Sequence, residues 1–276
     1  MQLPSPTWFV GCGNMAGAMI EGWRSAGIDL SMATAIRPSG KPVEGVRTVK
    51  SIEEAGAAPR MIVLGFKPQT LDEVAPELQP WVTSKTIVVS ILAGVEAESL
   101  RARFRKGIIV RAIPNLPVAV RRGVVALHSD DLDDKARKQV SDAFAALGFA
   151  MWAESEKALA AIGAVAGAGP AYVARFIDAL AAAGVKQGLP EELAATVALE
   201  TVLGTAWMAA ASQEPMEALA RRVASSRGTT EAGLGVLDRE GAFQQLIAAT
   251  IDAARRLSAS TPARIDTTMV FEVTQG

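Results

Sequence analysis

The sequence contains very little of the chemistry on which many enzyme classes depend. Its 276 residues include one cysteine, Cys12, and one histidine, His128. A single cysteine excludes an intrachain disulfide, and together the two residues provide neither a His/Cys zinc site nor a Cys–His nucleophile pair. No spacing of Asp and Glu indicates a carboxylate site, so we predict no metal. His128 ends an apolar run, which predicts a surface residue at a strand end rather than a catalytic base.

An excess of charge of one sign is missing as well. The chain has 28 basic and 29 acidic residues, whereas a surface that binds nucleic acid usually has a basic excess, so we do not expect nucleic acid as a partner. Residues 1–8 lack the basic start and apolar core of a signal peptide. The longest uncharged stretch, 158–174, is mostly Ala and Gly and is shorter than a membrane span. We therefore expect a cytoplasmic protein without a membrane partner.

The first part of the chain alternates short β-branched runs with amphipathic segments. The pattern predicts strands over 8–10, 33–36, 61–66, 86–92, 108–111, 124–127 and 149–152, and helices over 14–26, 71–78, 96–104 and 133–147. Strand–helix alternation of this kind indicates βαβ units and a mostly parallel sheet of the Rossmann type.

The second part has no strand pattern. Helices are predicted over 156–163, 170–183, 191–211, 215–224 and 243–257. We therefore expect an α/β domain over residues 1–154 and an all-α domain over 155–276. The helix over 191–211 is apolar nearly all round, and so small a domain has little interior in which to bury it. A second subunit would bury this helix, so we predict a homodimer, or a higher homo-oligomer, built on these helices.

A glycine-rich turn follows the first predicted strand. Residues 11–16 read Gly-Cys-Gly-Asn-Met-Ala, which matches Gly-x-Gly-x-x-Ala. Gly11 permits the tight turn, Gly13 lets the backbone approach a pyrophosphate, and Ala16 lets the helix pack closely on the strand. This Gly-x-Gly, unlike those at 167–169 and 233–235, follows an apolar strand and opens an amphipathic helix. The position predicts a dinucleotide site.

The end of the second strand indicates the cofactor. NAD enzymes commonly place an acid there for the ribose 2′-hydroxyl, but this chain has Arg37, Ser39 and Lys41. Two cations and a hydroxyl favour NADP(H), with NAD(H) as a second candidate. The next two strands end in Gly65-Phe66-Lys67-Pro68 and in Leu92-Ala93-Gly94, where the cofactor crevice of a doubly wound sheet lies. From its spacing alone, Lys67 fits a cofactor contact and a solvated loop lysine equally well.

One turn in the helical part is rich in hydroxyl groups. Residues 224–230, Ala-Ser-Ser-Arg-Gly-Thr-Thr, precede a predicted helix and offer N–H groups and hydroxyls to a carboxylate. An ordinary N-cap and loop would have the same composition, so the turn alone does not distinguish the two.

Six motifs, spread over nearly the whole chain, resemble pyrroline-5-carboxylate reductase. They lie at residues 11–16, 66–69, 90–94, 111–117, 167–172 and 225–230. The last three, in this order and at these separations, are far more specific than a Rossmann fingerprint.

The resemblance implies a Rossmann domain followed by a helical domain that interlocks with that of a second subunit. It implies reduction of Δ1-pyrroline-5-carboxylate to L-proline by NAD(P)H. By motif it assigns Thr230 as the catalytic residue, and it assigns substrate contacts to Glu156, Ser225, Gly228, Thr229 and Thr230. It assigns cofactor contacts to Gly11, Cys12, Gly13, Asn14, Met15, Ala16, Arg37, Ser39, Ser51, Gly65, Phe66, Lys67, Pro68, Leu92, Ala93 and Gly94.

The chain departs from the family pattern at a few positions. Arg227 stands where the family usually has Gly, inside the expected carboxylate loop, and Leu116, Ala168 and Arg222 differ as well. Reduction of a related cyclic imine acid therefore remains an alternative, as does an NADP-binding regulatory protein without activity. A β-hydroxyacid dehydrogenase is disfavoured. That family relies on a lysine on the helix between its domains, and residues 161–172 of this chain contain none.

Overall fold

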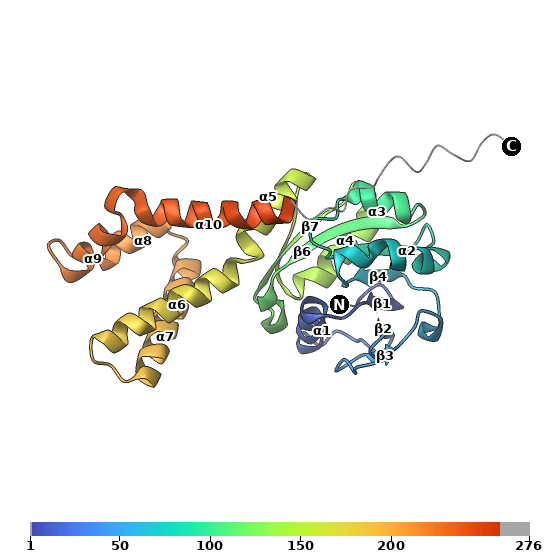
Figure 1. Cartoon of the computed structure of the whole chain (residues 1–276), viewed down its shortest axis with the longest axis horizontal. Helices are drawn as coiled ribbons and strands as arrows, with labels where there is room; N and C mark the ends of the chain where they lie inside the picture. Colours follow the sequence, from blue (N-terminus) through green and yellow to red (C-terminus); the bar gives the residue numbers. More distant parts are fainter. Residues whose placement is uncertain (1, 260–276) are drawn as a thin grey trace. The chain divides into compact units, whose positions relative to one another are not determined.

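The computed structural model describes residues 2–259 (Figure 1). Contacts divide the chain into two compact units. The sheet unit extends up to Ala168, and the helical unit comprises Gly169–Arg255.

The sheet unit contains one eight-stranded sheet in the order β3-β2-β1-β4-β5-β6-β7-β8. Every neighbouring pair is parallel except β6 and β7. The predicted Rossmann-type, mostly parallel sheet is therefore confirmed. The strands are β1 (Thr7–Val10), β2 (Ala33–Ile36), β3 (Arg47–Val49), β4 (Met61–Leu64), β5 (Ile87–Ser90), β6 (Ile108–Pro114), β7 (Gly123–His128) and β8 (Gly148–Trp152).

Helices cover both faces of this sheet. The α-helices are α1 (Asn14–Ser25), α2 (Leu71–Leu78), α3 (Ala97–Arg103), α4 (Asp134–Ala145) and α5 (Glu156–Ala166), joined by short 3-10 turns η1 (Glu53–Ala55), η2 (Pro68–Thr70), η3 (Gln79–Trp81) and η4 (Leu116–Val120). Alternate residues of β1 belong to different cores: Phe9 packs with α1 and α4, whereas Trp8 packs with α2 and α3. Side chains that alternate along a strand point to opposite faces, so the sheet lies between two helical layers (Figure 1).

Trp23 shows how tightly the first layer is packed. Its ring lies 5.8 Å from that of Phe9 and 5.5 Å from that of Phe144, centroid to centroid. Its Nε1 donates to the Ala143 carbonyl at 2.7 Å. Full burial of one such side chain contributes about 1.5–3 kcal/mol.

Two local features of the sheet differ from the predictions. β3 was not predicted, because a three-residue edge strand with an exposed arginine has almost no periodicity. His128 does end a strand, but the predicted surface position is wrong because only 5% of the residue is exposed. The chain after β8 passes over the end of β7, and the Ala153 carbonyl lies 3.0 Å from His128 Nδ1.

The helical unit contains α6 (Gly169–Lys186), α7 (Glu191–Ser212), α8 (Met216–Val223), α9 (Thr229–Leu237), η5 (Arg239–Gly241) and most of α10 (Ala242–Ala259). The helices α6 and α7 form a hairpin, in which a Cβ on Gly184 would lie 3.4 Å from the Ala194 Cβ. Among the described residues of this unit, only Ala194, Ala198 and Leu219 are buried.

Large apolar side chains of α6 and α7 are exposed instead. They are Val173, Phe176, Leu180, Val185, Leu193, Val197, Leu199, Leu203, Trp207 and Met208. By length and composition alone, 156–186 (mean hydropathy 1.3) and 191–212 (mean hydropathy 1.4) could cross a membrane. The first of these segments is broken between α5 and α6, and Leu159 within it is buried against the sheet.

Candidate functional site

The turn between β1 and α1 has room only for small residues. Gly11 has φ +71°, and a Cβ on it would lie 2.6 Å from the Phe66 Cβ. A Cβ on Gly65 would lie 2.5 Å from the Gly11 carbonyl oxygen and 3.1 Å from the Ala16 Cβ. The close packing that the sequence predicts at Gly11 and Ala16 is therefore present, and the ends of β1 and β4 meet at this turn.

The first turn of α1 carries unpaired backbone donors. Gly13 is the N-cap and provides no side-chain bond, and the first turn contains no acid. The first helical bond runs from Gly17 N–H to the Gly13 carbonyl at 2.9 Å, so the N–H groups of Asn14, Met15 and Ala16 have no helical acceptor. Free donors at the positive end of a helix favour an anion such as a pyrophosphate.

A cavity of about 530 Å³ lies at the carboxyl ends of these strands, within the size range of ligand sites. Among the described residues that line it are two cations, Arg37 and Lys67, and no carboxylate. The lining residues are Gly11, Cys12, Gly13, Arg37, Pro38, Ser39, Gly65, Phe66, Lys67, Pro68, Ile91 and Ala93. A second cavity of about 440 Å³ shares Cys12, Gly13 and Arg37 with it and adds Asn14 among the predicted residues; its lining also includes the carboxylates of Glu21 and Glu44. Most of the predicted cofactor residues are thus brought together around adjoining cavities.

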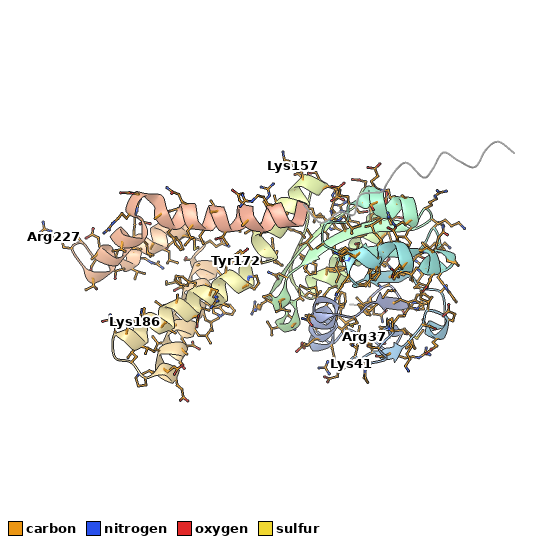
Figure 2. The ribbon with its side chains drawn as sticks, in the orientation of Figure 1. Arg37, Lys41, Lys157, Tyr172, Lys186 and Arg227 are labelled. Carbon is orange, nitrogen blue, oxygen red and sulfur yellow. The ribbon has the colours of Figure 1, made fainter. Side chains whose placement is uncertain are left out.

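Three cations lie around the loop after β2. Arg37 Nη1 donates to the Lys41 carbonyl at 3.2 Å, and the Lys41 N–H donates to Ser39 Oγ at 3.3 Å. Figure 2 labels Arg37 and Lys41 on this loop. Gly40 has φ +63°, and a Cβ on it would lie 2.7 Å from Lys50 Cε, so the Lys50 stem crosses the loop. Sequence reasoning missed Lys50 because it missed β3, an edge strand with almost no periodicity.

The thiol of Cys12 lies inside the glycine-rich turn and is buried. Burial raises its pKa, although the positive charge of Arg37 opposes the shift. A neutral thiol at this position adds no negative charge where the geometry favours an anion.

The remaining predicted cofactor residues differ in their surroundings. Leu92 is buried in the core, and Gly94 turns the chain with φ +74°. Ala93, between them, lines the cavity. Ser51 lies just after β3 and lines neither cavity. Its hydroxyl hydrogen-bonds Glu53 and thereby lowers the pKa of that carboxyl.

The predicted carboxylate loop connects α8 to α9. The Gly228 N–H donates to the Ser225 carbonyl at 2.9 Å, and a Cβ on Gly228 would lie 2.3 Å from Ser225 Oγ. The first helical bond of α9 runs from Ala232 N–H to the Gly228 carbonyl. The N–H groups of Thr229 and Thr230 therefore have no helical acceptor, as the sequence predicts for a helix N-terminus.

Arg227 occupies the sharpest point of this loop. It has φ +59°, and its N–H donates to Glu231 Oε2 at 2.5 Å. Its side chain projects from the loop between α8 and α9 (Figure 2).

Glu156 lies in the sheet unit, at the start of α5. One carboxylate oxygen pairs with Arg111 of β6, and the other accepts from the Ala97 N–H at 2.9 Å. The other predicted substrate residues, Ser225, Gly228, Thr229 and Thr230, belong to the helical unit.

The parallel sheet, the glycine-rich turn and the cationic loop after β2 define a Rossmann-type dinucleotide-binding domain. Residues 8–94 match the family model described as NADP oxidoreductase, coenzyme F420-dependent. Residues 156–261 match the model described as pyrroline-5-carboxylate reductase dimerisation.

Curated relatives are similar over nearly the whole chain. The pyrroline-5-carboxylate reductase of Pseudomonas aeruginosa is 36% identical over 91% of this chain and 94% of its own. The pyrroline-5-carboxylate reductase 2 of Bacillus subtilis is 33% identical, with 91% and 93% covered. The chain therefore belongs to the pyrroline-5-carboxylate reductase family, which confirms the resemblance seen in its motifs.

Solved structures agree with this assignment. The Plasmodium falciparum pyrroline carboxylate reductase with NADP bound is similar with a TM-score of 0.85 and 29% identity, over 94% of this chain and 98% of that one. The enzyme of Coxiella burnetii has a TM-score of 0.83 and 29% identity, over 92% and 97%. The apolar helices α6 and α7 lie within the matched dimerisation segment, so their exposed side chains belong to a family dimerisation domain.

Proposed function

We propose that this protein reduces Δ1-pyrroline-5-carboxylate to L-proline with NADPH, the final step of proline biosynthesis, and that NADH is a second donor. The relatives at 33–36% identity carry this activity in their names. The observation in this chain that carries the proposal is the loop of Ser225, Gly228, Thr229 and Thr230, which presents hydroxyl groups and unpaired N–H donors at the start of α9.

The cavity in the sheet unit fits a dinucleotide. The free N–H groups at the start of α1 would hold the pyrophosphate, and Arg37, Ser39, Lys41 and Lys50 would surround a 2′-phosphate. The segments Phe66–Pro68 and Leu92–Gly94 would flank the rest of the cofactor. NADPH supplies the hydride when bound.

The work left to the side chains is holding and orienting the substrate. A cyclic imine is basic and binds already protonated, so its reduction needs no obligatory general acid. The free N–H groups at the start of α9 and the hydroxyls of Ser225 and Thr229 would hold the substrate carboxylate, in a turn that Gly228 permits. The Thr230 hydroxyl would hydrogen-bond the ring nitrogen, which orients the carbon that is reduced.

We further propose that residues 1–154 form the cofactor domain and residues 155–276 the substrate and dimerisation domain of a homodimer. A second copy that covers α6 and α7 accounts for their exposed apolar side chains without a membrane. We propose a soluble, cytoplasmic enzyme. Because its basic and acidic residues nearly balance, we propose no nucleic-acid partner.

The test is to follow NADPH oxidation by absorbance with pyrroline-5-carboxylate and to identify the product. Formation of proline, with NADPH preferred over NADH, is the expected outcome. Binding of NADPH without oxidation in the presence of any imine would instead identify an inactive regulatory protein.

Arg227 supports one second candidate, a reductase of a related cyclic imine acid. A long cation at positive φ in the carboxylate loop changes the size and charge of the place where a substrate would bind. The six-membered homologue of pyrroline-5-carboxylate should be assayed beside the five-membered ring. A higher kcat/KM for the larger ring would establish this alternative.

A further inference from the structure

Two alternate residues of β6 and the residue that follows this strand hold α5 against the sheet. Arg111 of β6 pairs with Glu156 at the start of α5. A Cβ on Gly163 would lie 2.8 Å from Ile113 Cδ1, and Asn115 Nδ2 donates to the Ala166 carbonyl at 3.0 Å at the end of the helix. Residues two apart along a strand share one face, so Arg111 and Ile113 contact α5 at its start and middle. Asn115, just after β6, contacts its end.

The contact at the start of α5 is an ion pair between a buried guanidinium and a carboxylate whose side chain is 33% exposed. Arg111 is 7% exposed, and its Nε is buried without an acceptor among the described residues. Glu156 is the only acid paired with Arg111 in this part of the chain. A guanidinium in such surroundings fixes its partner carboxylate strongly, because loss of the partner would leave the charge uncompensated.

The second oxygen of Glu156 stabilises a different helix. It accepts from the N–H of Ala97, the first residue of α3, at 2.9 Å. The N-cap residue of α3, Glu96, provides no side-chain bond. Glu156 therefore takes the place of a local cap, which is the usual partner of such an orphan donor.

The segment that leads into α3 lines the cofactor cavity. Residues 91–96 connect β5 to α3, and Ile91 and Ala93 belong to the cavity lining. The Leu92 N–H donates to Ser90 Oγ at 3.3 Å near the start of the segment, whereas the bond to Glu156 holds its far end. Gly94, with φ +74°, lies between these two points and allows the turn.

We infer that Glu156 is a positioning residue for the cofactor segment 91–96, acting through the Ala97 N–H and oriented by Arg111. The inference rests on the proposed function only in taking NADP(H) as the occupant of the cavity. It differs from the role that the family resemblance implies for Glu156, which is contact with the substrate. Both carboxylate oxygens have protein partners within the sheet unit.

The two roles predict changes in different constants. The amide of Glu156→Gln can still accept from the Ala97 N–H. It carries no charge, however, so Arg111 no longer orients it and the far end of the segment is held less firmly. Loss of a charge-assisted hydrogen bond corresponds to about a tenfold change in an equilibrium constant. We expect the Kd for NADPH, measured by fluorescence titration of the whole oligomer, to rise about tenfold. The KM for the imine and kcat at saturating NADPH should stay as in the unsubstituted protein.

Three results would overturn the inference. A higher KM for the imine with an unchanged Kd for NADPH would place Glu156 in the substrate site. An equal rise in the Kd for NADPH and the KM for the imine would indicate a general structural defect. No change in either would mean that Glu156 does not position the segment. The NADPH titration needs no turnover, so it can be interpreted even if the protein reduces no pyrroline-5-carboxylate.

A control and a second substitution complete the experiment. Glu154→Gln removes an exposed carboxylate two residues away and should leave the Kd for NADPH unchanged. Arg111→Met combined with Glu156→Gln removes both charges. The double variant should bind NADPH no more weakly than Glu156→Gln alone, because no uncompensated guanidinium remains. If the two substitutions weakened NADPH binding additively, Arg111 and Glu156 would not be coupled, which contradicts the inference.

Discussion

The two units of this protein obtain their stability in different ways. The sheet unit has two large buried clusters, one on each face of the sheet, and every residue of the clusters lies between Leu3 and Leu159. The helical unit has long regular helices, yet only two alanines and one leucine of its described residues are buried. The sheet unit thus contains its own core, whereas the apolar surface of the helical unit is suited to a core shared with another chain.

This difference shows why regular secondary structure is not evidence of independent stability. A helix such as α7 satisfies its backbone hydrogen bonds internally, but most helical stability in proteins comes from packing of an apolar face. The sheet unit packs such faces against its own strands. The proposed cofactor site therefore lies in the unit that has its own core, and the proposed substrate loop in the unit whose apolar surface is uncovered in the single chain.

The largest expected effect is loss of assembly by Leu203→Glu. Leu203 lies on α7 and is 46% exposed in the single chain. A carboxylate buried without a partner between subunits costs about 4 kcal/mol, so we expect the dissociation constant to rise about a thousandfold. Light scattering after size exclusion measures this. Met32→Glu, at a 58% exposed position of the sheet unit, is the matched control and should leave the mass unchanged.

A smaller effect, confined to the other unit, is expected from Trp23→Phe. The substitution removes the bond from Nε1 to the Ala143 carbonyl and leaves a small void between Phe9 and Phe144. The sheet unit should lose about 2 kcal/mol of unfolding free energy in urea. The dissociation constant of the oligomer should not change. If it rose together with the loss of unfolding free energy, the two units would not have separate sources of stability.

Thr230→Ala tests the chemistry assigned to the helical unit. Loss of the hydroxyl that we propose bonds the ring nitrogen should lower kcat about tenfold, equivalent to about 1.4 kcal/mol. Binding of NADPH, measured by fluorescence, should be unaffected, because the proposed cofactor residues lie in the sheet unit. Thr250→Ala removes a hydroxyl that bonds the Leu246 carbonyl within α10 and serves as the control. Equal losses in turnover and NADPH binding would refute the assigned role.

The smallest expected effect is that of Lys50→Met on cofactor choice. Lys50 crosses the loop that carries Ser39 and Lys41. Loss of one exposed cation near a 2′-phosphate should raise the KM for NADPH about fivefold, near 1 kcal/mol, and change the KM for NADH much less. Lys106→Met, at an exposed site before β6, should alter neither constant. A proportional rise for both cofactors would remove Lys50 from phosphate selection.

Periodicity predicted most of the sheet unit because burial there is two-sided and local. The apolar runs of β4 and β5 predict central strands, and the structure has them at nearly the expected bounds. β3 was missed because an edge strand is half exposed. β6 extends past the predicted Arg111 to Pro114 because Ile113 pairs with Ala126 across the antiparallel hairpin. That pairing depends on a distant segment, which no local pattern contains.

The site shows the same division. Gly11, Gly13 and Ala16 could be predicted because backbone proximity demands small residues at fixed spacing. The partners of Glu156 could not, since Arg111 and Ala97 lie 45 and 59 residues away in the chain. Lys50 likewise depends on the crossing of two loops at Gly40. Contacts between distant segments are fixed by the tertiary fold, so one sequence alone gives no signal for them.

The position of the buried clusters also bears on the order in which the chain is synthesised. Every buried core residue of the sheet unit precedes α6 in the chain and emerges from the ribosome before it, so this unit can start to fold before the helices that follow have emerged. The helices that follow emerge with their apolar surfaces uncovered and stay so until a second polypeptide arrives. Association of two chains depends on their concentration, so maturation of the helical unit would depend on it too. Until then α6 and α7 are the surface on which a chaperone would act.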